Sequence, residues 1–128
     1  ARHIFDSREH MEISIEVIYQ ILTQWAQQQT LRTYTDLSNE YQSLTNEWHA
    51  PHGSWDQPLG KLANVLSEAG QPPLTSLVIL KNGHEPGNDF WGCAPNVPSR
   101  PRNQLVRVTE WMKMVNKCYT HNWSVTLP

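Results

Sequence analysis

Three stretches in the middle of the chain decide the fold that the sequence predicts. They are Tyr34-Thr35-Asp36-Leu37-Ser38, then Pro58-Leu59-Gly60-Lys61-Leu62-Ala63, and then Pro72-Pro73-Leu74-Thr75-Ser76-Leu77-Val78-Ile79, which continues to Asn82-Gly83-His84-Glu85-Pro86-Gly87. Their apolar periodicity and turn residues predict, in order, a helix, a second helix, a strand and a turn.

The two predicted central helices have recognisable ends. Thr35 can cap the first with its hydroxyl, and Asp36 complements the positive end of the helix dipole. Asp56 is a suitable N-cap for the second, and Gly70 is a suitable C-terminal stop. The buried stripe of this second helix consists of Leu59, Leu62, Ala63 and Leu66.

The segment from Leu74 to Lys81 is rich in Leu, Val, Ile and Thr, which predicts a largely buried strand. Asn82-Gly83 favours a tight hairpin turn. The returning arm, His84 to Trp91, contains Pro86 and Gly87 and is expected to be an edge strand or an irregular wing. The expected fold class is therefore α+β, with a winged-helix-like core, a small antiparallel hairpin, and helices at both ends of the chain.

The flanking helices are predicted from apolar spacing, from Ser14 to Gln28 and from Arg102 to His121. On the last helix we expect a buried face made of Leu105, Val108, Met112, Val115 and Tyr119. His10-Met11 resembles a cloning junction, so we interpret residues 1–10 as vector-derived and residues 11–128 as a single globular domain.

Composition limits the classes of function. A formal charge of −2 gives no broad positive field for nucleic acid, and six tryptophans are typical of packed cores or interfaces. Cys93 and Cys118 are too few for a disulfide framework, which favours a reducing, cytoplasmic setting. Both are interpreted as structural thiols. No apolar run is long enough to predict a membrane span, and no cofactor motif is present.

One candidate site is formed by His49, His52, Asp56 and His84, with Glu85 as a more distant partner. Imidazole and carboxylate are the usual zinc ligands, and such a site could activate water in a hydrolase or nuclease. The alternative interpretation is that these are surface or hydrogen-bonding histidines. His-x-x-His on a loop with Pro51 and Gly53 favours that alternative, because its side chains need not converge.

A second candidate site follows from the helix, helix, strand and turn order, which is that of a winged helix-turn-helix. The second helix would expose Gln57, Lys61 and Asn64, side chains that can contact bases or phosphates. Tyr34 lies just outside the preceding helix, where it either staples the helix entry or faces a ligand. An ordinary solvated helix face has the same composition.

The middle of the chain also resembles the C-terminal domain of the O6-alkylguanine-DNA alkyltransferases and the alkyltransferase-like proteins. The resemblance is carried by Tyr34-Thr35-Asp36-Leu37-Ser38, Gln57-Pro58-Leu59-Gly60 and Pro73-Leu74-Thr75-Ser76-Leu77-Val78. It implies a winged-helix scaffold in which Tyr34 is the one matched residue that keeps a nucleic-acid role. Leu74 stands where that family has its nucleophilic cysteine, so the resemblance excludes a cysteine alkyl acceptor at this position.

From these observations we expect a small non-enzymatic binding module whose partner is a nucleic acid or a protein. The protein branch includes an inhibitor or immunity role in a bacterial toxin or defence system. The alternative is a metal- or histidine-dependent hydrolase that uses the region of His49, His52 and His84.

Overall fold

The computed structural model describes residues 12–128, and this part of the chain is mostly helical, with one small sheet. Residues 1–10, interpreted above as vector-derived, lie outside the described residues. The α-helices of the described part are α2 (Ile15–Gln28), α3 (Tyr34–Thr45), α4 (Asp56–Glu68) and α5 (Gln104–Thr120); the strands are β1 (Arg32–Thr33) and β2 (Val78–Ile79), and two 3-10 turns are η1 (Leu74–Leu77) and η2 (Asn88–Phe90).

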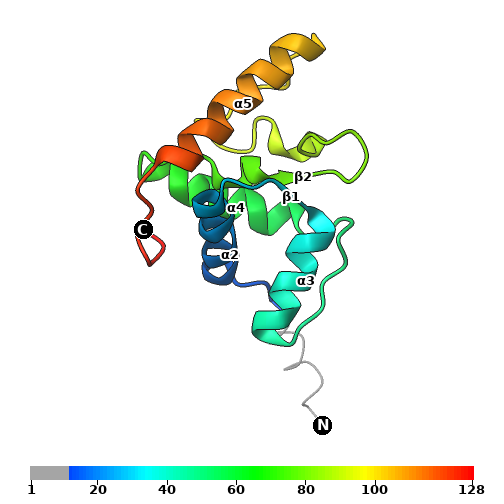
Figure 1. Ribbon diagram of the computed structural model, residues 1–128, viewed down its shortest axis with the longest axis vertical. Helices are drawn as coiled ribbons and strands as arrows, with labels where there is room; N and C mark the ends of the chain where they lie inside the picture. The colour runs from blue at the N-terminus through cyan, green and yellow to red at the C-terminus, as the bar shows by residue number, and fades with distance from the viewer. Residues whose placement is uncertain (1–11) are drawn as a thin grey trace.

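Helix α2 is central to the packing (Figure 1) because it contacts α3, α4, α5 and η1. Its predicted apolar stripe is confirmed, since Ile18, Leu22 and Trp25 have almost no exposed surface. Ser14 caps this helix, and its hydroxyl accepts a hydrogen bond from the Val17 backbone N–H at 3.3 Å. The predicted start of the helix is confirmed as well.

The starts of α3 and α4 each differ by one or two residues from the sequence prediction. Thr33, not Thr35, caps α3 in a reciprocal capping box with Asp36. Tyr34 is therefore the first residue of the helix. In α4 the N-cap is Trp55, which makes no capping hydrogen bond with its side chain, and Asp56 is already helical. The capping role predicted for Asp56 is wrong, which leaves its carboxylate free for other contacts.

The predicted antiparallel hairpin is wrong. In the described residues the sheet pairs β2 with β1 in parallel, with Arg32 opposite Val78 and Thr33 opposite Ile79. The chain does turn back after β2, but one backbone bond, from Leu80 N–H to the Glu85 carbonyl at 2.7 Å, closes that loop. Pro86 follows directly and has no N–H to donate, so the return arm does not extend a ladder.

The segment Leu74–Leu77 is fully buried as predicted, but it forms the 3-10 turn η1 rather than the first half of a strand. This turn packs against α2, α4 and α5 and so occupies the middle of the core. Burial on every side produces the same run of apolar residues in a turn as in a strand, which is why the sequence alone did not distinguish the two.

Helix α5 lies within the predicted range, and Asn103 caps it by accepting from the Val106 N–H at 3.0 Å. The predicted buried face is wrong at its start, because the Leu105 side chain is 76% exposed. Val115 is buried as predicted, and Trp111, Met114 and Cys118 are buried beside it. Val108, Met112 and Tyr119 are partly buried against the core. The first turn of α5 extends past the body of the protein, where apolar spacing has no core to meet (Figure 1).

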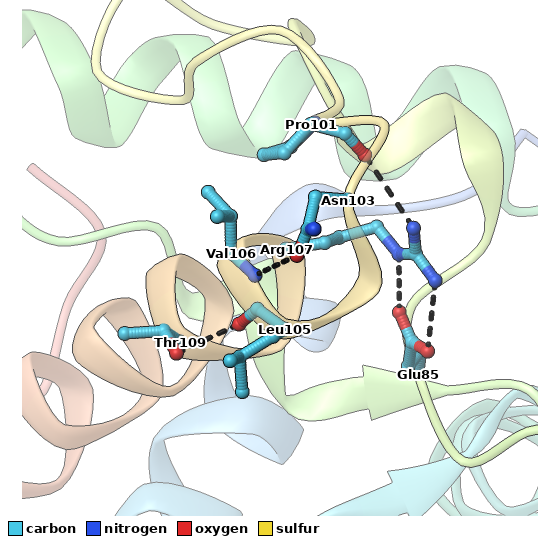
Figure 2. Close-up of polar contacts among 7 residues, drawn as sticks. All are labelled: Glu85, Pro101, Asn103, Leu105, Val106, Arg107 and Thr109. Atoms are coloured by element: carbon cyan, nitrogen blue, oxygen red, sulfur yellow. Dashed lines mark hydrogen bonds and ion pairs between the residues drawn. The ribbon is translucent and has the colours of Figure 1, made fainter.

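An ion pair attaches the loop after β2 to the start of α5. Figure 2 shows Arg107 reaching both carboxylate oxygens of Glu85, at 2.8 Å from Nε and 3.4 Å from Nη2, with Nη1 donating to the Pro101 carbonyl. Arg107 is only 8% exposed. Paired side chains with this geometry fix the loop relative to the helix.

Four of the six tryptophans, Trp25, Trp55, Trp91 and Trp111, belong to the core. Three of these donate their indole N–H to a partner: Trp25 to Glu40, Trp55 to the Ser38 hydroxyl and Trp111 to the Ser76 carbonyl. These rings therefore hold the fold together and are not available to a partner. Trp48 is the most exposed of the remaining two, at 45%.

Candidate functional site

The predicted metal ligands do not come together. His49 packs edge-on against the rings of Tyr41 and Trp55, with centroids 5.3 and 5.8 Å away, and its Nε2 lies 3.6 Å from Glu47 Oε1. His84 is exposed at a loop position with φ of 56°. Within residues 12–128 no three His, Cys, Asp or Glu side chains are grouped so as to hold a metal ion.

His52 and Asp56 are the two predicted ligands that remain near each other. Both side chains are exposed, and His52 is close enough to oppose in small part the raised pKa of Asp56, which results first from partial burial and then from Asp89. Glu85, the more distant predicted partner, is committed to Arg107. Only half of the predicted four-residue set therefore shares one region of the surface.

The predicted nucleic-acid residues are also divided. Gln57 and Lys61 are exposed on α4. The Asn64 amide, by contrast, donates to the carbonyls of Gly60 and Cys93 at 2.9 and 3.0 Å, which ties α4 to the loop after η2. Tyr34 is half-buried, and its hydroxyl accepts from the Gly87 N–H at 3.1 Å. Two of the four side chains thus have structural partners.

A different constellation forms where α4, η1 and η2 meet. Asp56 from the first turn of α4 and Asp89 from η2 lie beside a cavity of about 20 Å³, large enough for one water-sized group. We call this the acid pocket and define it by its lining residues, which are Asp56, Leu59, Gly60, Thr75, Asp89, Phe90 and Cys93.

The two carboxyl groups line the same pocket, and Asp89 affects the titration of Asp56. The pKa of Asp56 is raised above its ordinary 3.8, first by partial burial and then by a hydrogen bond and charge repulsion from Asp89. Two carboxylates in contact cannot both be ionised without a penalty, so such a pair binds either a proton or another cation. Perturbed carboxyl pairs of this kind are concentrated at functional sites.

Thr75 contributes a buried hydroxyl to the same pocket. Its side chain is 4% exposed, and Oγ1 has no hydrogen-bond partner. The Cys93 thiol is close enough for Thr75 to lower its pKa, although burial has the larger effect and raises it. The two groups do not form a hydrogen bond of regular distance and angle. A buried hydroxyl without a partner is unfavourable, and it marks a position where a ligand atom would be stabilised.

Tyr34 links the acid pocket to a wider surface groove. Burial raises the pKa of the Tyr34 phenol, and the charges of Asp56, Asp89 and Cys93 raise it further, so these groups lie near one another. Tyr34 also lines an adjacent groove of about 360 Å³ with Pro51, His52, Leu80 and Lys81. A ligand that reaches the acid pocket could therefore extend along this groove.

Asp89 and Thr75 are the site residues that sequence reasoning missed. Thr75 is part of an apolar run and was interpreted as a strand residue. Asp89 is in a Gly- and Pro-rich loop, where a charged residue is expected on general grounds. No sequence pattern around Thr75 or Asp89 indicates a site, because each residue belongs to the pocket only through its proximity to Asp56 in the fold. Asp56 is 33 positions before Asp89 in the sequence.

Comparison with known proteins adds no relative, since no family model, curated protein or solved structure matches this chain. Within the described residues no helix is long and apolar enough to cross a membrane.

Proposed function

We propose that this chain is a small non-enzymatic binding module that recognises a protein partner through a positively charged group of that partner. The observation that carries the proposal is the contact between Asp56 and Asp89 at the mouth of a pocket whose wall includes the unpartnered Thr75 hydroxyl. A cation placed there relieves the repulsion between the carboxylates without requiring a proton.

The same feature makes a protein a better partner than a nucleic acid. Asp56 in the first turn of α4 and Asp89 in η2 give the acid pocket two carboxyl groups, so this pocket repels a phosphate. Gln57 and Lys61 line a separate groove that also contains Glu12. Phosphate contacts supply most of non-specific nucleic-acid affinity. The nucleic-acid version, together with the winged-helix class and the alkyltransferase-like resemblance behind it, has less support.

An inhibitor or immunity role against a toxin or defence protein fits this proposal, because such modules act by occupying a charged surface of their target. Cytoplasmic function is part of the same proposal. It is supported by the free thiols of Cys93 and Cys118.

Binding of charged peptides tests this proposal. Fluorescently labelled Lys-rich, Arg-rich and Glu-rich octapeptides and a duplex DNA would be titrated with the protein and followed by anisotropy. We expect the basic peptides to bind and Asp89→Asn to weaken them by about tenfold, the loss typical of removing one charged partner.

The matched control for Asp89→Asn is Glu68→Gln, which removes the same charge from the exposed far end of α4. If both variants weaken binding equally, the peptides respond only to net charge and the acid pocket is not the site. Tighter binding of DNA than of basic peptides would contradict the choice of a protein partner.

A hydrolase remains the second candidate because two neighbouring carboxyl groups, with the pKa of Asp56 raised and with His52 nearby, can act as general acid and base. Of the histidines predicted from the sequence, this version uses His52 alone. Hydrolysis of ester or phosphodiester substrates that is lost in Asp56→Asn would favour it. The metal version would in addition require metal in elemental analysis of the purified protein.

A further inference from the structure

The acid pocket has the size of a single small polar group. Its volume is about 20 Å³, and a site of roughly 10–15 Å³ is enough for one water molecule. An ammonium group is compact, whereas the guanidinium of arginine is a planar fork with five N–H donors. The enclosed volume of the pocket therefore matches an ammonium group better than a guanidinium group.

The acceptors around the pocket match the donors of an ammonium group. Asp56 and Asp89 each provide a carboxylate. Thr75 provides a buried hydroxyl whose oxygen has no hydrogen-bond partner in the structure. A primary ammonium has three N–H donors and no acceptor. One donor for each of these three residues would satisfy the Thr75 hydroxyl and neutralise the charge of the pair.

The remaining wall of the pocket suits an alkyl chain better than a hydrated metal ion. Leu59 and Phe90 are buried apolar residues that line it. They would contact the methylene groups of a lysine stem, and the ring could also face the cation. Magnesium and calcium prefer about six to eight oxygen ligands, many of them water, and apolar walls cannot replace those ligands.

On these grounds we propose that the acid pocket binds a primary ammonium group, carried by a lysine side chain of the partner. This inference rests on the proposed function and specifies its ligand. The Tyr34 groove beside the pocket would then contact the residues next to that lysine.

Small-molecule titration followed by amide NMR shifts tests the inference on the whole chain. The probes are Nα-acetyl-lysine amide, Nα-acetyl-arginine amide, Nα,Nε-diacetyl-lysine amide and magnesium chloride. We expect the lysine amide to shift the amide signals of Gly60, Thr75 and Asp89 and to bind at least about tenfold more tightly than the arginine amide. The diacetylated compound, which has no charge, should leave these signals unchanged.

Two variants locate the effect. Thr75→Val removes one acceptor while keeping the shape, and it should weaken the lysine amide while leaving the remaining spectrum native. Asp89→Asn should weaken it further, and Glu68→Gln should have no effect. A native spectrum for each variant shows that weaker binding does not result from unfolding.

The possible failures are distinguishable. If the arginine amide binds at the pocket as tightly as the lysine amide, the ammonium inference is overturned while the proposed cation-binding function stands. If magnesium shifts the same signals and displaces the lysine amide, the pocket is a metal site and the inference is overturned. If no cation shifts these signals, both the inference and the proposed function are overturned.

Discussion

The unpartnered hydroxyl of Thr75 leads to a prediction about stability that is opposite in sign to the usual effect of a core substitution. Thr75 is 4% exposed and its Oγ1 has no hydrogen-bond partner. Replacing it with valine keeps the branched shape and exchanges the hydroxyl for a methyl group. We expect Thr75→Val to stabilise the unliganded protein.

The magnitude follows from the penalty that the hydroxyl now imposes. A buried polar group without a partner is unfavourable by about 1–3 kcal/mol, and the adjacent cavity of about 20 Å³ gives the new methyl group room. We therefore expect a gain of about 1–2 kcal/mol in the free energy of unfolding. For a domain of this size that corresponds to a rise in Tm of roughly 3–8 °C.

The assay is urea unfolding followed by tryptophan fluorescence, because four of the indole rings are buried. With a slope of about 1–3 kcal/mol per molar urea, the expected gain moves the midpoint upward by roughly 0.3–2 M. Thr23→Val is the matched control. Thr23 is also buried, but its hydroxyl donates to the Gln20 carbonyl at 3.1 Å, so its loss should destabilise by about 0.5–1.5 kcal/mol.

A result in which Thr75→Val lowers the midpoint as much as Thr23→Val would refute this reasoning. It would mean that the Thr75 hydroxyl has a partner in solution, with the Cys93 thiol as the nearest group able to provide one. The acid pocket would then lack its unsatisfied acceptor, and the argument for a ligand there would depend on the two carboxylates alone.

Three further predictions follow from the titratable groups. The Arg107 guanidinium holds the pKa of Glu85 below its ordinary 4.5. The ion pair therefore stabilises the fold fully above pH 4.5, and this stabilisation is lost as the pH falls through the lowered pKa. The urea midpoint of Glu85→Gln should be below that of the wild type at pH 7, and the two midpoints should converge in acid. The pKa of Asp56 is raised by partial burial and by the neighbouring Asp89 carboxyl, so the folded state loses stability as the pH rises from 3.8 through the raised pKa. The urea midpoint of Asp56→Asn should therefore be higher than that of the wild type at pH 7. Equal midpoints for the two proteins from pH 3 to 7 would be evidence against an unfavourable interaction between Asp56 and Asp89. Burial raises the pKa of the Cys118 thiol to about 12, so this thiol should react more slowly than Cys93. Mass spectrometry after iodoacetamide treatment of the native protein at pH 8 should find Cys93 modified first. Equal rates of modification of the two thiols would show that the core opens at Cys118.

Local chemistry was enough to predict some parts of the fold. The range of helix α2 and the buried stripe of α4 follow from apolar spacing, which acts within a few positions along the chain. The predicted N-caps differ from the observed ones by one or two residues where several neighbouring residues are able to cap the helix. Thr33 rather than Thr35 caps α3 because Asp36 can complete a capping box only with Thr33.

The contacts between distant segments could not be predicted from local patterns. The parallel pairing of β1 with β2 joins residues more than 40 positions apart, and no local pattern specifies that partner. Leu105 has the apolar character of a core residue, yet it lies on a turn of α5 that extends past the core. Arg107, by contrast, is a charged residue that is buried. Its burial is possible because its guanidinium donates to the Glu85 carboxylate and to the Pro101 carbonyl.

The candidate site was decided in the same way. Asp56 was predicted to be a helix cap, but the capping position belongs to Trp55, and Asp56 lines the acid pocket together with Asp89. Thr75 was assigned to a strand on its apolar neighbours, whereas the turn η1 places its hydroxyl beside the cavity. Local sequence determines whether a residue belongs to a helix, a strand or a turn. The pKa of a carboxyl group and the hydrogen bonding of a buried hydroxyl depend on groups that are distant in the sequence and that come close only in the folded protein.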